Sequence, residues 1–139
     1  MNNTSRTLLT ACAMAISGSA TALDTSEPFL CAVAQVTECL DGLGCETVLP
    51  EMVGAPTFIW VYLKKNRIRT NQNEDGSRIA NRTEIDGRHI LQGAEDGDPE
   101  AIDGAGWTLS IEDSTGRFAA AVAIQQATLS MFGSCTELP

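Results

Sequence analysis

The residues of this 139-residue chain with the clearest chemistry are its cysteines, four of which follow residue 30. An even set of cysteines in an exported domain predicts two disulfides, and four cysteines allow three pairings. The glycine-bearing turn 41–44 favours Cys39 with Cys45, which leaves Cys31 to meet Cys135. Because no Cys-x-x-Cys pair occurs, the spacing favours structural disulfides over a zinc or redox site, and we predict no cofactor.

Carboxylates gather in two segments, 71–77 and 95–103, and such oxygen clusters suit hard cations such as calcium. The first segment matches the opening of an EF-hand loop, but Arg82 stands at the twelfth position, where a bidentate Glu is required. The second segment has Ala101 where the loop needs glycine. We therefore interpret both segments as solvated turns and predict no metal site.

The chain contains one histidine, His89, directly after the Asp86-Gly87 turn. Histidine is the usual acid-base group at neutral pH, but it needs a nucleophile or a second titratable group beside it. No serine lies in a nucleophile elbow, and nothing in the sequence selects a pair of carboxylates. We interpret His89 as an exposed or half-buried strand residue, and we predict that the protein is not an enzyme.

The N-terminal residues 1–22 have the composition of a cleavable signal peptide. A single charge at Arg6 precedes an apolar run from Leu8 to Ile16, and small residues lead to a cleavage site after Ala22. The run is too short to span a bilayer, so we predict no transmembrane segment. Lipidation at Cys12 is a less favoured alternative, because it would leave the following apolar and small residues without a role. The predicted location is therefore periplasmic or secreted.

Removal of the leader leaves residues 23–139, a length that suits one disulfide-linked domain. The processed chain retains 8 basic and 18 acidic residues, a formal charge of −10. Such a charge makes nucleic acids and anionic membranes poor partners, whereas a basic protein would suit it.

The hydrophobic pattern predicts an all-β fold. Trp107, Leu109 and Ile111 alternate with polar residues, and Asp86-Gly87 is typical of a type I′ hairpin turn. The expected strands cover 29–36, 57–63, a short piece around 68, 77–85, 88–92, 107–112, 118–124 and 127–134. Pro50 opens a short helical turn over 50–53. Seven or eight strands joined in order predict an antiparallel meander, closed as a small barrel or as a two-sheet sandwich.

Three aromatic residues, Phe58, Trp60 and Tyr62, share one face of the strand 57–63. That face is our candidate ligand face, because it could line a cavity or form a contact patch. The alternative, a strand buried on both faces, requires no ligand.

Several short features together resemble a family of small exported proteobacterial proteins without known activity. The features are Cys31, Glu38-Cys39, Cys45, Pro56 and Phe58, Gln92-Gly93, Gly106-Trp107, the turn 113–116 and the segment 132–136. The resemblance implies a periplasmic or secreted location and assigns no functional residues. The acidic segments 71–77 and 95–103 look like additions to that pattern.

The leading hypothesis is a non-enzymatic binding or interaction module of the cell envelope. One version is an inhibitor of a basic hydrolase, motivated by the charge of −10. The alternative is a β-barrel carrier of a small apolar ligand, motivated by the aromatic face. An enclosed cavity would favour the carrier, and a filled core would favour recognition at the surface.

Overall fold

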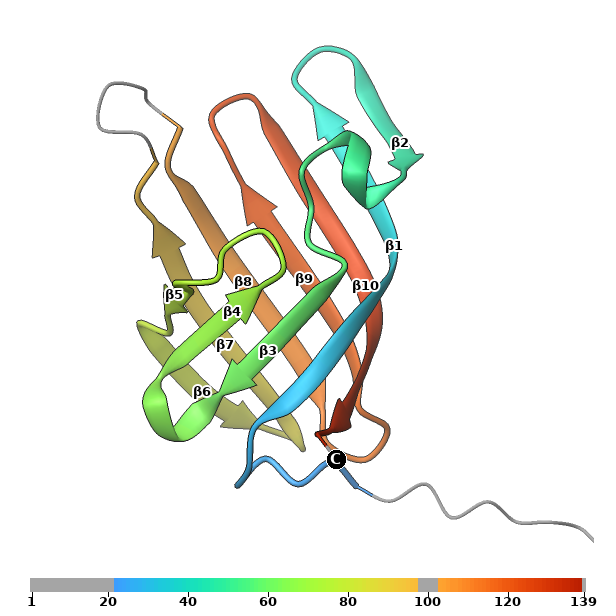
Figure 1. The fold of residues 1–139 in the computed structure, drawn as a ribbon. Helices are drawn as coiled ribbons and strands as arrows, with labels where there is room; N and C mark the ends of the chain where they lie inside the picture. The colour runs from blue at the N-terminus through green and yellow to red at the C-terminus, as the bar shows by residue number, and fades with distance from the viewer. Residues whose placement is uncertain (1–21, 98–102, 139) are drawn as a thin grey trace, which may run out of the picture.

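Ten antiparallel strands make up the fold in the computed structural model, which describes residues 22–97 and 103–138 (Figure 1). The all-β prediction is confirmed, with more strands than the seven or eight expected. The strands are β1 (Phe29–Leu40), β2 (Gly44–Val48), β3 (Phe58–Tyr62), β4 (Arg67–Thr70), β5 (Ser77–Arg78), β6 (Asn81–Ile85), β7 (Arg88–Glu95), β8 (Ala105–Glu112), β9 (Arg117–Ala123) and β10 (Ala127–Glu137). None of the helices in the described ranges is long and apolar enough to cross a bilayer.

All ten strands belong to one sheet that curls into a half-barrel, so the sandwich alternative is wrong. The order across the sheet is β5-β4-β3-β1-β10-β9-β8-β7-β6, and β2 pairs with β1 alone. Since the first long strand pairs with the last, the chain follows the up-and-down path of a barrel. The opening lies between β5 and β6, which are consecutive in sequence.

The predicted strand 77–85 is divided into β5 and β6 by Ile79 and Ala80. Ile79 is buried, and its amide donates to the Asn66 carbonyl at 2.9 Å. The next amide, of Ala80, donates to Gln92 of β7 at 2.8 Å. Ile79 and Ala80 thus connect the β4 side of the opening to the β7 side. They narrow the opening between β5 and β6, although β5 and β6 do not pair with each other.

The structure extends β1 to Leu40 and adds β2, which the sequence pattern did not indicate. A register shift between Val33 and Gln35 separates the two halves of β1. Beyond it, β1 pairs with β10 on one side and forms a two-stranded ribbon with β2 on the other. The β2 half of this ribbon is exposed, so its side chains do not need to alternate. The predicted turn at 50–53 is confirmed as the 3-10 helix η1 (Pro50–Met52), and a second one, η2 (Leu63–Lys65), follows β3.

Two tight turns hold the barrel strands in register. Asp86 and Gly87 both have positive φ, 50° and 70°, as a type I′ turn requires. Gly116 has φ +67° and packs against the backbone of Cys135, where a side chain would meet the carbonyl oxygen. This turn joins β8 to β9.

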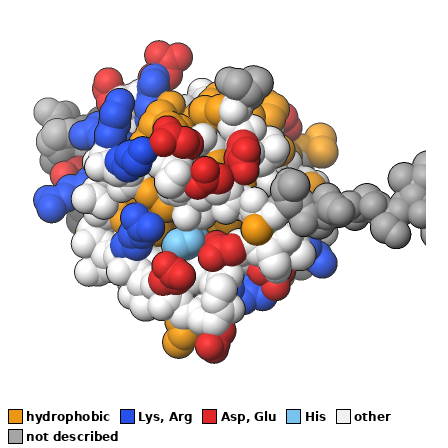
Figure 2. Space-filling view, turned by 90° about the horizontal axis from the view of Figure 1, so that it is seen from below, with side chains coloured by type: hydrophobic (Ala, Val, Ile, Leu, Met, Phe, Trp, Pro, Cys, Tyr) orange, Lys and Arg blue, Asp and Glu red, His pale blue; other side chains and the backbone are white. Residues whose placement is uncertain are grey.

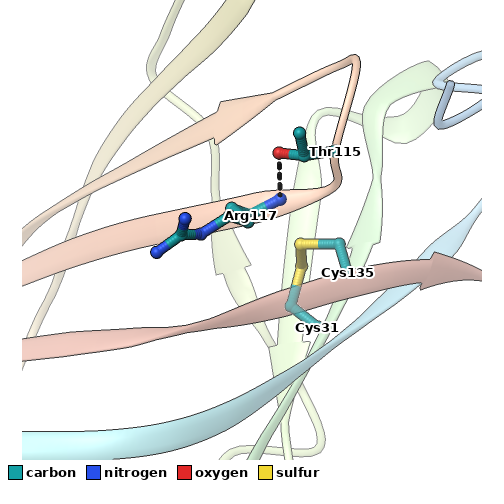
Figure 3. The surroundings of a disulfide bond; sticks show 4 residues. All are labelled: Cys31, Thr115, Arg117 and Cys135. Carbon is teal, nitrogen blue, oxygen red and sulfur yellow. Dashed lines mark hydrogen bonds between the residues drawn. A yellow bond between two sulfur atoms is a disulfide. The ribbon is translucent and has the colours of Figure 1, made fainter. Parts of the chain in front are cut away.

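Both disulfides join residues that are directly opposite each other in neighbouring strands. Cys31 of β1 is bonded to Cys135 of β10 in the buried core, beside the turn that carries Thr115 (Figure 3). Cys39 is bonded to Cys45 across the exposed β1–β2 ribbon. This is the pairing that the spacing favours. The first bond links the two ends of the domain, and the second fixes a hairpin.

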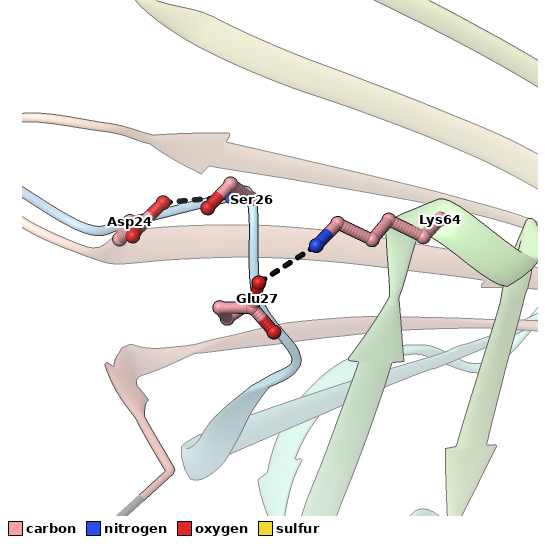
Figure 4. Close-up of polar contacts among 4 residues, drawn as sticks. All are labelled: Asp24, Ser26, Glu27 and Lys64. Carbon is pink, nitrogen blue, oxygen red and sulfur yellow. Dashed lines mark hydrogen bonds and ion pairs between the residues drawn. The ribbon is translucent and has the colours of Figure 1, made fainter.

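The segment 22–28 crosses the end of the barrel at which β10 finishes (Figure 1). The Leu23 amide donates to the Asp113 carbonyl at 2.8 Å, and Lys64 pairs with Glu27 at 2.7 Å (Figure 4). Hydrogen bonds from the Ser26 side chain and backbone lower the pKa of Asp24, so its carboxylate persists to a lower pH than an ordinary aspartate. We call the end of the barrel that segment 22–28 crosses the lower end, and the opposite end of the barrel the upper end.

Candidate functional site

The barrel interior is packed in its lower half and hollow in its upper half. Phe29, Leu91 and Ile111 are fully buried and fill the lower half with the Cys31–Cys135 bond. Above them lies a half-open cavity of about 290 Å³. Its size is near the lower limit for sites that bind small molecules.

The cavity wall is formed by the inward-facing side chains of six strands and by the segment 53–56. Apolar residues dominate it, and a few polar residues stand near its opening. The apolar group is Val53, Ala55, Pro56, Ile59, Ile68, Ala105, Trp107, Leu109, Ala120, Val122, Ile124, Leu129 and Met131; the polar side chains are Thr70, Gln72, Asn73 and Glu95. An apolar wall with few polar groups is typical of a small-molecule site.

Trp107 forms one wall of the cavity and lies flat against β7. Its partner in the register is Gly93, and any side chain there would collide with the indole ring. Gly93 therefore makes room for the ring. The indole Nε1 is buried without a hydrogen-bond partner among the described residues, although buried donors are normally satisfied.

On β9, the strand beside Trp107, the inward side chains are small, and this leaves the space open. Ala120 and Val122 of β9 face inward and are only partly buried. Higher up, Glu95 ends β7 on the inner face and accepts a hydrogen bond from the hydroxyl of Ser77, which is 5% exposed. The cavity thus has an apolar floor and one carboxylate near its opening.

The predicted ligand face lies outside the cavity. Phe58, Trp60 and Tyr62 point to the outer surface, Phe58 being 42% exposed, while Ile59 of the same strand faces the cavity. The rings of Phe58 and Trp60 are 6.1 Å apart. Trp60 and Tyr62 instead line a shallow groove on the outer face, together with Arg69, Thr70, Asn71 and Glu74. Alternation along β3 separates the aromatic face from the cavity.

His89 is buried at 2% exposure, so the interpretation of an exposed or half-buried residue is wrong. It faces inward from β7, and its Nε2 lies 3.0 Å from Oδ1 of Asp113. Seen from the lower end, the histidine is visible between carboxylates (Figure 2). It belongs to the packed half and is not part of the cavity wall. The pair closes the lower end of the core.

The described parts of the two acidic segments, residues 71–77, 95–97 and 103, lie toward the upper end, because β4 and β7 run toward it. Asn73 of the first and Glu95 of the second reach the cavity. Within the described ranges, no three His, Cys, Asp or Glu side chains gather closely enough to hold a metal ion. Residues 98–102 of the second segment, including Ala101, lie outside the described residues.

The cavity residues do not stand out as a site in the sequence, although their pattern contains a signal. In the sequence, the alternation around Trp107 indicates a core residue, and Glu95 belongs to a segment that we expected to be a solvated turn. The inward positions of β8 carry Trp107 and Leu109, whereas those of β9 carry Ala120 and Val122. A large inward residue beside small ones on the next strand indicates unfilled space, but the strand register must be known before the two can be compared.

Comparisons with protein families, with curated proteins and with solved structures found no match to this chain.

Proposed function

We propose that this protein is a non-enzymatic, exported binding protein whose small, mainly apolar ligand occupies the barrel cavity. The observation that carries the proposal is the half-open cavity of about 290 Å³ above a packed core. Barrels of about eight strands hold one small ligand in this way. The unpaired indole N–H of Trp107 and the Glu95 carboxylate supply a donor and an acceptor near an apolar wall.

The disulfides support the part of the proposal that places the protein outside the cytoplasm. Buried and exposed cysteines are both paired, which indicates an oxidising setting outside the cytoplasm. The Leu23 amide already donates to the Asp113 carbonyl. If a signal peptide is removed after Ala22, the new α-ammonium of Leu23 can keep that hydrogen bond. Membership of the exported family that the chain resembles is part of this proposal.

The expected processed protein begins at Leu23 and carries no lipid. Its mass should increase by two hydrogens for each of the two disulfides on full reduction. Intact-mass spectrometry of protein recovered from the periplasm or the medium measures both quantities. A mass that begins at Cys12 with added acyl chains would contradict the proposed processing, and a free thiol before reduction would contradict the pairing.

Filling the cavity should weaken ligand binding strongly without unfolding the domain. We expect Ala120→Phe to weaken the binding of 1-octanol at least about tenfold, because the new ring takes the ligand's place. Titration calorimetry measures the affinity, and circular dichroism checks the fold.

The matched control is Ala119→Phe, one residue earlier on β9. Ala119 is exposed on the outer face, so the same ring is added outside the cavity. Unchanged binding in A119F and lost binding in A120F would support the cavity as the site. Equal loss in both variants, or octanol binding to neither the variants nor the unmodified protein, would contradict the proposed function.

A further inference from the structure

The charged residue of the cavity points to the kind of head group that a ligand carries. Glu95 is the only charged side chain among the described residues that line the cavity. We infer that the cavity selects amphiphiles with a cationic, hydrogen-donating head, such as a primary alkylammonium, over alcohols and carboxylates of the same length. The inference rests on the proposed function and adds the chemical class of the ligand.

Among the described residues, Glu95 has a hydrogen bond but no ion pair. Its described partner is the neutral hydroxyl of Ser77, itself buried. No ion pair joins Glu95 to a Lys, Arg or His in the described part of the chain; the pairs there are Lys64–Glu27, Arg88–Glu112 and His89–Asp113. A partly buried carboxylate gains more from a cationic partner than a solvated one does, because water screens it less. The position therefore suits a ligand cation.

Trp107 adds a second contact for the same group. Glu95 pairs with Ala105 and Gly93 pairs with Trp107, so Glu95 and Trp107 are diagonal neighbours on the inner face of the sheet. An ammonium held by the carboxylate is then within reach of the indole ring, whose face attracts cations. The alkyl chain below it meets Leu129 and Met131. A ligand carboxylate in this place would instead be repelled by Glu95.

The test compares octylammonium, 1-octanol and octanoate, which share one chain length and differ in head charge. We expect octylammonium to bind the processed protein about tenfold more tightly than octanol, since a hydrogen bond to a charged partner contributes roughly that factor. Octanoate should bind most weakly. Titration calorimetry at fixed pH and ionic strength gives the three affinities.

Two variants assign the preference to its residue. Glu95→Gln should lower the affinity for octylammonium to that for octanol. Glu84→Gln removes the same charge from an exposed position on β6 and should leave the order unchanged. Equal affinities for all three ligands, or an unchanged preference in E95Q, would overturn the inference about the head group. In both cases the ligands still bind, so the proposed function of the cavity would stand. Failure of all three ligands to bind would overturn the proposed function.

Discussion

Replacing both Cys31 and Cys135 by alanine is expected to destabilise the domain by about 5 kcal/mol in the chain-entropy account of disulfides. The bond joins residues separated by 104 positions, so its loss frees nearly the whole unfolded chain. Both side chains are also buried, at 0% and 8% exposure, and alanine leaves space behind in the core. Because small domains are stable by roughly 5–15 kcal/mol in total, the variant should be close to unfolding at 37 °C. Urea denaturation followed by circular dichroism measures the loss.

The corresponding removal of the Cys39–Cys45 bond is the control. That bond closes a separation of only 6 residues in an exposed ribbon, so we expect a loss of about 2 kcal/mol. The cavity lies elsewhere and should keep its ligand affinity in this variant. Equal losses from the two pairs would contradict the account in which the core disulfide holds the two ends of the barrel together.

Substituting Gly93 by alanine is expected to destabilise the domain by about 2 kcal/mol and to disturb the cavity. The new Cβ would lie 2.6 Å from Cε2 of Trp107 and 2.5 Å from the carbonyl oxygen of Arg78. The backbone oxygen cannot move freely, so the indole ring must shift. The emission of Trp107, read in a Trp60→Phe background that leaves it as the only tryptophan, should change with the ring's position.

Gly106→Ala provides the matched control on the neighbouring strand. A Cβ at Gly106 meets nothing within 4 Å, and alanine in a strand loses less conformational entropy than glycine. We expect stability within about 0.5 kcal/mol of the unmodified protein and unchanged Trp107 emission. If G93A behaved like G106A, the packing of Trp107 on Gly93 would not define the cavity wall.

The fold class was predictable because a strand with one buried face shows an alternation of apolar and polar residues in the sequence. The inward residues Trp107, Leu109 and Ile111 are all buried, and the turns at Asp86-Gly87 and Gly116 have the φ values that their types require. The choice of one curled sheet over a sandwich was not predictable. It depends on the pairing of β1 with β10, a contact between the two ends of the chain that no local pattern encodes.

The candidate site was less predictable than the fold. The aromatic face of Phe58, Trp60 and Tyr62 stands out in the sequence. The alternate residues of β3 face the barrel interior, so the aromatic side chains lie on the outer surface. The cavity arises because the inward positions of β9 beside Trp107 and Leu109 carry only Val122 and Ala120. The burial of His89 likewise depends on which face of β7 points inward and on how the lower end of the barrel is closed. The residue type reveals neither.

A crystal structure of the processed protein grown with octylammonium tests ligand binding in the cavity most directly. We expect electron density for the alkyl chain between Trp107 and Met131, with the ammonium beside Glu95. Density confined to the outer groove at Trp60 and Tyr62, or a cavity that remains empty at saturating ligand, would contradict binding in the cavity.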